Sequence, residues 1–225
     1  MAQSPEDKPL DVSRREWLKT AGLVGAAVVT PAVTFVQGQA DAPENLTTAE
    51  ADALDAIVAR LIPTDDNGPG AREARTARYI DRALGGFLAP SRDAYRDGLA
   101  SVDRYARTSK GARFADLSAA DQDAVLTDME KGTAAGFTPN STSFFALVRT
   151  HTIQGTFGDP YYGGNANFTG WDLIGYPGVR LVVTEADQRL DPNLAPTHLS
   201  AYDYGMFSPK PARAGLRLLK VFHGD

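Results

Sequence analysis

The chain has 225 residues, of which 43% are hydrophobic and 23% charged, so most of it can form one domain with an ordinary core. A formal net charge of −5 argues against nucleic acid as a partner, because phosphate backbones require a basic surface. The sequence has no cysteine, which excludes disulfides, iron–sulfur clusters and cysteine-ligated zinc, and its 3 histidines follow no metal-binding spacing. We therefore expect no metal site in this chain.

The N-terminal segment resembles an export signal. Residues 13–19 are S-R-R-E-W-L-K, and the stretch over 20–40 that follows carries no charge. A basic region followed by an apolar one is the plan of a secretory signal. Arg14 and Arg15 fit the twin-arginine consensus S-R-R-x-F-L-K, with Trp17 in place of Phe. The pattern predicts export of the folded protein by the twin-arginine translocase.

A membrane anchor is the alternative for this uncharged stretch, since it is nearly long enough to span a bilayer. Its glycines and threonines make it only mildly hydrophobic, and Gly38 and Ala40 are small, as a signal peptidase requires. We favour a signal over residues 1–40, cleaved after Ala40, followed by a single domain over 41–225.

Two helices are predicted at the start of that domain. The first begins at a capping box formed by Thr47 and Glu50, carries apolar residues at helical spacing, and ends at Pro63. A turn-rich connection leads to the second, whose apolar stripe lies over 79–88, Phe87 included, and which ends near Pro90.

Three more helices follow, each preceded by a capping serine. Ser91 is predicted to cap the third, Ser118 followed by Asp121 the fourth, and Ser141 the fifth, which leads into His151. The inward positions of the third are Tyr95, Leu99, Val102 and Ala106. The fold class is therefore mainly α, a small helical bundle with short connections.

The stretch over 155–178 departs from the helical pattern, because it combines many glycines with aromatic residues and few charges. Disordered segments are poor in aromatics, so we expect a long ordered loop that buries some of these rings. Beyond it, spaced prolines predict an extended tail over 187–225. Residues 181–183 and 218–222 are candidates for short strands.

The glycine-rich stretch has neither the spacing nor the context of a nucleotide-binding loop, so no cofactor is expected in this chain. His151 and Asp159 suggest a general base oriented by a carboxylate, as in a hydrolase or isomerase. We favour a structural role for His151 at the end of a helix, since no nucleophile stands nearby. No catalytic residue is assigned.

The polar and aromatic side chains of the loop have two functional interpretations besides core packing. Aromatics with amides can stack on sugars, as in an independent periplasmic sugar-binding module, and such residues are also enriched at the centres of protein interfaces. The candidates are Asp159, Tyr161, Tyr162, Asn165, Asn167, Trp171 and Tyr176.

Three features together resemble one family. They are the twin-arginine leader, L-I-P-T-D at 61–65, and G-D-P-Y-Y-G-G-N at 158–165 followed by G-W-D-L-I-G-Y-P-G at 170–178. With these motifs the chain resembles the gluconate 2-dehydrogenase subunit 3 family over nearly its whole length.

This resemblance implies an accessory subunit without catalytic residues of its own. Its partner would be a large flavoprotein of the glucose–methanol–choline type, which binds FAD and oxidises a sugar or polyol, and a haem-containing cytochrome subunit often passes the electrons on. The small subunit is thought to help the large one mature and to supply the export signal for both. The complex would then lie in the periplasm or on the periplasmic face of the inner membrane, and the interface would use residues 159–176.

Overall fold

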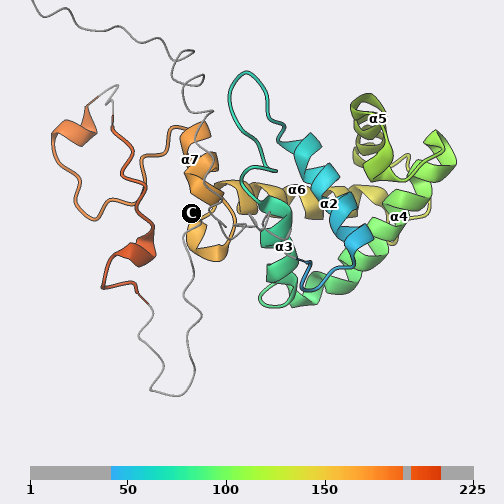
Figure 1. Ribbon diagram of the computed structural model, residues 1–225, viewed down its shortest axis with the longest axis horizontal. Coiled ribbons are helices and arrows are strands. Elements are labelled where there is room, and N and C mark those ends of the chain that lie inside the picture. The colour runs from blue at the N-terminus through green and yellow to red at the C-terminus, as the bar shows by residue number, and fades with distance from the viewer. Residues whose placement is uncertain (1–41, 190–193, 209–225) are drawn as a thin grey trace, which may run out of the picture. The chain divides into compact units, whose positions relative to one another are not determined.

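The computed structural model describes residues 42–189 and 194–208, and these residues are mainly helical (Figure 1). The predicted mainly α fold is confirmed. The helices are α2 (Thr48–Leu61), α3 (Thr76–Leu84), α4 (Arg92–Lys110), α5 (Ala119–Glu130), α6 (Ser141–Phe157) and α7 (Thr169–Leu173). Short 3-10 turns are η1 (Ala89–Ser91), η2 (Phe114–Asp116), η3 (Pro160–Tyr162), η4 (Ala166–Phe168), η5 (Ala186–Gln188) and η6 (Ala201–Asp203).

Several predictions fall outside the described residues. These are the signal over 1–40 with Arg14 and Arg15, the strand at 218–222, and the end of the tail from 209 onward. The single domain over 41–225 stays a prediction.

The N-termini of α2 and α5 form as the sequence predicts. At α2, the Thr47 hydroxyl accepts from the Glu50 N–H at 3.3 Å, and the Glu50 carboxylate accepts from the Thr47 N–H at 2.8 Å. At α5, the Ser118 hydroxyl accepts from the Asp121 N–H at 3.2 Å. Both pairs satisfy backbone donors that have no partner within the helix.

Two predicted caps and one predicted helix end are wrong. Ser91 makes no capping bond, because η1 already holds it in a helical conformation. Asn140, rather than Ser141, caps α6 by accepting from the Ser143 N–H at 2.8 Å. Ser141 instead donates its hydroxyl to the Met129 carbonyl at 3.1 Å. His151 does not end a helix, since α6 continues to Phe157.

The core lies where α2, α3, α4 and α5 pack against α6. The predicted inward positions of α4 are all buried: Tyr95, Leu99, Val102 and Ala106. Phe87 is a correction, because α3 ends at Leu84 and two glycines carry Phe87 away from the stripe, leaving it 63% exposed. Residues 181–183 form no strand, and no helix among the described residues is long and apolar enough to cross a bilayer.

A buried carboxylate fixes the segment before α2. Asp81, on α3, accepts from the backbone N–H groups of Glu44, Asn45 and Leu46 at 2.6, 2.9 and 2.9 Å. Since hydrogen bonds to a charged acceptor are among the stronger ones, this single side chain holds the start of the domain against α3.

Candidate functional site

The aromatic loop, predicted over 155–178, begins at Gly158, because α6 continues to Phe157, and it is folded directly onto the end of that helix. The Asn165 N–H donates to the carbonyl of Gly155 at 2.8 Å. A Cβ atom at Gly164 would overlap that same carbonyl, and one at Gly170 would overlap the carbonyl of Thr156. These glycines are therefore needed for the close approach of two backbone segments, and not for flexibility.

Asn165 is the centre of the loop. Its side chain is fully buried, accepts from the Gly170 N–H at 2.7 Å, and donates to the Gly158 carbonyl at 2.9 Å. Its backbone φ of 46° lies in the left-handed region, which asparagine tolerates better than most residues. One amide group thus joins three parts of the loop.

Aromatic packing fills the space beneath this network. The Trp171 ring is 4% exposed, and its indole N–H donates to the Phe157 carbonyl at 3.0 Å. The ring centroids of Phe168 and Tyr176 lie 5.5 and 4.8 Å from that of Trp171. Trp171 is thus the small core of the loop itself.

A carboxylate of the loop holds the later part of the chain. Asp159 Oδ1 accepts from the Tyr161 N–H at 2.9 Å and from the Ser200 hydroxyl at 2.7 Å, and Oδ2 accepts from the Ala201 N–H at 3.1 Å. The carboxylate therefore caps η3 and anchors the start of η6 at the same time.

Three tyrosines extend this contact. The Tyr202 ring stacks on Tyr161 with centroids 3.8 Å apart, and its hydroxyl lies 2.6 Å from that of Tyr162. The hydrogen bond with Tyr162 raises the pKa of the Tyr202 phenol above its ordinary value. The Tyr202 phenol therefore stays neutral at physiological pH, and either hydroxyl can donate in this bond.

His198 makes a further contact between the tail and the loop. Its ring stacks on Phe168, with centroids 4.5 Å apart and an interplanar angle of 6°. Its Nε2 lies 2.7 Å from Asp172 Oδ1. Tail and loop are thus joined through polar and aromatic contacts at several places.

His151 takes no part in the loop. Its ring is buried within the helices, stacked against Tyr95 with centroids 5.7 Å apart, and its Nδ1 lies 2.9 Å from the Tyr95 hydroxyl. Burial lowers the pKa of His151 and raises that of Tyr95. Asp159, the carboxylate considered as its orienting partner, binds Ser200 and Ala201 instead.

A family model described as gluconate 2-dehydrogenase subunit 3 matches residues 48–178, more than half of the chain. The chain belongs to the gluconate 2-dehydrogenase subunit 3 family. Comparisons with curated proteins and with solved structures found no match. As a subunit 3 family member, the chain has an accessory role in a dehydrogenase complex, which implies a catalytic partner.

The predicted interface residues of this subunit 3 chain occupy different environments. Asn165 and Trp171 are buried within the chain, so they shape the loop and do not present their side chains to a partner. Asp159 and Tyr161 are partly buried and hold the tail. The exposed candidates are Tyr162, Asn167 and Tyr176.

Three tail residues that complete this site were not predicted from the sequence: His198, Ser200 and Tyr202. A usable signal was present, since S-A-Y-D over 200–203 is a capping-box pattern. The structure forms it: the Asp203 carboxylate accepts from the Ser200 N–H at 2.8 Å. Within the described part of the chain, no group of three or more His, Asp and Glu side chains is placed to hold a metal ion.

Proposed function

We propose that this chain is the non-catalytic small subunit of an FAD-dependent sugar or polyol dehydrogenase, and that it supports maturation and twin-arginine export of the catalytic flavoprotein. The observation that carries the proposal is the family match over 48–178, which includes L-I-P-T-D at 61–65 and the whole aromatic loop. FAD would belong to the partner, and a haem-containing cytochrome subunit would accept the electrons. The complex would lie in the periplasm or on the periplasmic face of the inner membrane.

The use of the reactive side chains supports a non-catalytic role. His151 is buried against Tyr95, and the Asp159 carboxylate is occupied by hydroxyl and backbone donors from Ser200 and Ala201. Catalytic groups must reach a substrate, whereas both of these residues stabilise contacts inside the chain. The site therefore has the character of a folded contact surface and not of an active site.

The independent sugar-binding module is less well supported. Stacking on a sugar requires an open aromatic face, and Trp171, with 4% of its surface exposed, lies against Phe168 and Tyr176. Titration of the chain without residues 1–40 with sugars tests this alternative, because Trp171 is then its one tryptophan and saturable quenching of its fluorescence would favour the sugar-binding module over the accessory role.

The export role is tested by co-expression with the flavoprotein. Replacing both Arg14 and Arg15 by lysine keeps the positive charge but removes the guanidinium groups. We expect flavin and dehydrogenase activity to disappear from the periplasmic fraction and to remain in the cytoplasm. Lys19→Arg, in the same basic region, serves as the matched control and should export normally.

Maturation is tested by leaving this chain out. We expect the flavoprotein alone to be poorly soluble and low in flavin, and co-expression to restore a soluble yellow protein. Equal solubility, flavin content and export without this chain would contradict the proposal.

A further inference from the structure

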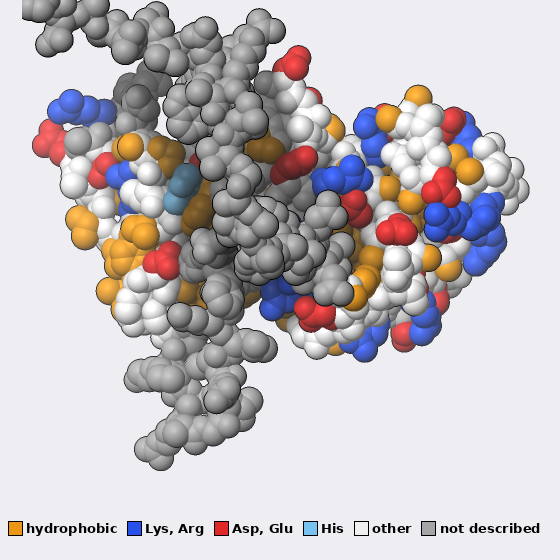
Figure 2. All heavy atoms as spheres, in the orientation of Figure 1, with side chains coloured by type: hydrophobic (Ala, Val, Ile, Leu, Met, Phe, Trp, Pro, Cys, Tyr) orange, Lys and Arg blue, Asp and Glu red, His pale blue; other side chains and the backbone are white. Residues whose placement is uncertain are grey.

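One segment carries most of the exposed hydrophobic side chains of the described residues. We call it the C-terminal arm, residues 174–189 and 194–208; its first five residues are also the end of the aromatic loop. Outside it, the large hydrophobic side chains that are exposed are Phe87, Ile153 and Tyr162. Within it they are Ile174, Tyr176, Leu181, Val182, Val183, Leu199, Met206 and Phe207. Figure 2 shows hydrophobic side chains gathered at the left, where Figure 1 draws the arm in orange to red.

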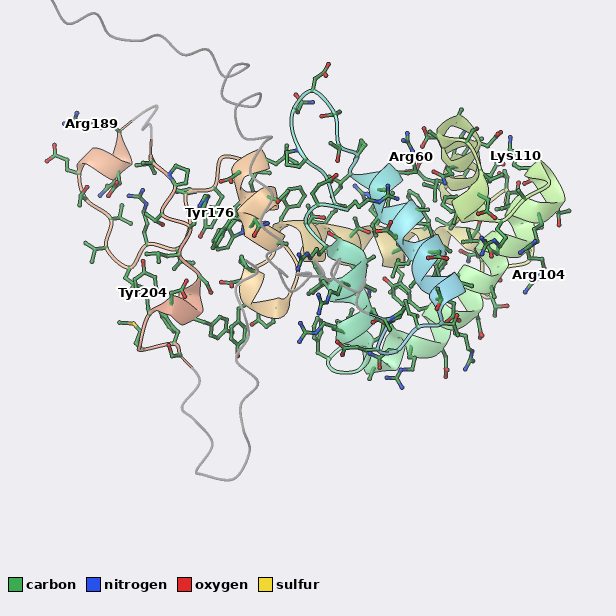
Figure 3. All side chains as sticks on the ribbon, in the orientation of Figure 1. Arg60, Arg104, Lys110, Tyr176, Arg189 and Tyr204 are labelled. Carbon is green, nitrogen blue, oxygen red and sulfur yellow. The ribbon has the colours of Figure 1, made fainter. Side chains whose placement is uncertain are left out.

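The polar groups of the arm are used internally. The Thr197 N–H donates to the Pro177 carbonyl at 2.7 Å, and the Val179 N–H to the Leu199 carbonyl at 2.8 Å. The Tyr204 hydroxyl, labelled in Figure 3, donates to the Val179 carbonyl at 2.8 Å. Polar contacts thus hold the arm together while its aliphatic side chains remain in solvent. In most surface segments the polar side chains face solvent and the large aliphatic side chains are more often buried.

An ion pair closes the most exposed part of the arm into a loop. Arg180 Nη1 lies 3.0 Å from Asp187 Oδ1, and Asp187 Oδ2 accepts from both the N–H and the hydroxyl of Thr184 at 2.8 Å. The hydrogen bonds from Thr184 are the main cause that lowers the pKa of Asp187, with Arg180 contributing further. The tip of this loop is the apolar run 181–183, in which Val182 is 75% exposed.

The exposed apolar area is large enough for a specific interface. A large side chain has a surface of roughly 200 Å², so about half exposure gives roughly 100 Å² each and on the order of 800 Å² for the set. A standard protein–protein interface buries about 800 Å² on each partner. Apolar surface of this extent, where it is contiguous, usually marks an interaction site.

We propose that the C-terminal arm is the docking surface for the catalytic subunit, with the tip over 181–183 at the centre of the contact. This inference rests on the proposed function and moves the predicted interface from the aromatic loop to the arm that the loop supports. The occupant is a folded protein with an apolar surface patch of its own, because the aliphatic tip offers few polar groups for recognition.

The charges of the arm favour a protein over a bilayer. Its described cations are Arg180 and Arg189, and its described anions are Glu185, Asp187 and Asp203. Attachment to an anionic membrane surface usually relies on an excess of lysine and arginine, which this segment lacks. Figure 3 shows Arg189 at the far left of the view, away from the helices.

The test uses the full, tagged chain co-expressed with the flavoprotein. The variant carries Val182→Asp and Val183→Asp, and the matched control carries Phe87→Asp, because Phe87 is similarly exposed but lies outside the arm. We expect the arm variant to reduce the co-purified flavin by about tenfold or more and the control by less than about twofold. Unchanged thermal midpoints of both purified chains would show that neither change unfolds the protein.

Four other results would contradict the proposed docking surface. If both variants retain the flavoprotein, the arm is not the docking surface, while the proposed function stands. If the wild-type chain itself elutes without any flavoprotein, the proposed function fails and this inference fails with it. A wild-type dimer that the arm variant dissociates, measured by light scattering, would overturn the inference in favour of self-association. Arm-dependent binding to phosphatidylglycerol vesicles would overturn it in favour of a membrane surface.

Discussion

Replacement of Asn165 by alanine tests whether the buried amide holds the aromatic loop together. The change removes the partner of the buried Gly170 N–H and that of the partly buried Gly158 carbonyl. Each costs about 1–3 kcal/mol. Alanine at a φ of 46° costs roughly 1–2 kcal/mol more than a residue suited to that conformation. We therefore expect the free energy of unfolding to fall by about 3–8 kcal/mol, a large fraction of the 5–15 kcal/mol typical of a domain.

Urea denaturation followed by far-ultraviolet circular dichroism measures this loss, and Trp171 fluorescence reports on the loop itself. Asn165→Gly is the matched control, since it removes the same hydrogen bonds but accepts positive φ, and it should be about 1 kcal/mol more stable than Asn165→Ala. A loss below about 1 kcal/mol for Asn165→Ala, or a glycine variant less stable than the alanine variant, would refute the reasoning.

Three further predictions follow from buried groups. Burial lowers the pKa of His151 below 6.5, so the unfolded chain binds a proton at this residue at a higher pH than the folded chain does. The urea midpoint should therefore decrease as the pH falls below about 6.5, and His151→Gln should flatten this dependence. Gly170→Ala would place a methyl group on the Thr156 carbonyl and should lower the thermal midpoint, whereas Gly86→Ala, with room for a Cβ, should change it little. Asp81→Asn should lower the free energy of unfolding by about 2–3 kcal/mol, measured in urea, because one amide oxygen cannot replace a carboxylate that accepts three backbone bonds.

The helical part of the fold could be predicted because its determinants are local. The capping box at Thr47 and the spacing of the buried residues in α4 depend on neighbours within one or two turns. Local rules failed where two capping residues are adjacent, because Asn140 and Ser141 can both cap a helix. Asn140 caps α6, and this leaves the Ser141 hydroxyl free to bind the Met129 carbonyl. Such a choice depends on a distant helix and leaves no local pattern.

The candidate site was predictable in composition but not in arrangement. Its aromatics and glycines indicated an ordered loop, yet which rings point inward depends on contacts between separate segments. Trp171 is buried because Phe157 supplies a carbonyl for its indole, and Tyr161 is covered because Tyr202 returns from the tail. Sequence periodicity carries no information on such pairs, so the buried candidates Asn165 and Trp171 could not be distinguished from the exposed ones.

The way in which α6 ends has a consequence for cooperativity. A helix leaves its last carbonyls without partners in the helix. Here the Asn165 N–H and the Trp171 indole bind the carbonyls of Gly155 and Phe157, and the Asn165 side chain binds that of Gly158. The last turn of α6 and the aromatic loop therefore complete one another and should open as a single unit. Amide hydrogens of both would then show a common free energy of opening in hydrogen exchange, although the segments differ in secondary structure.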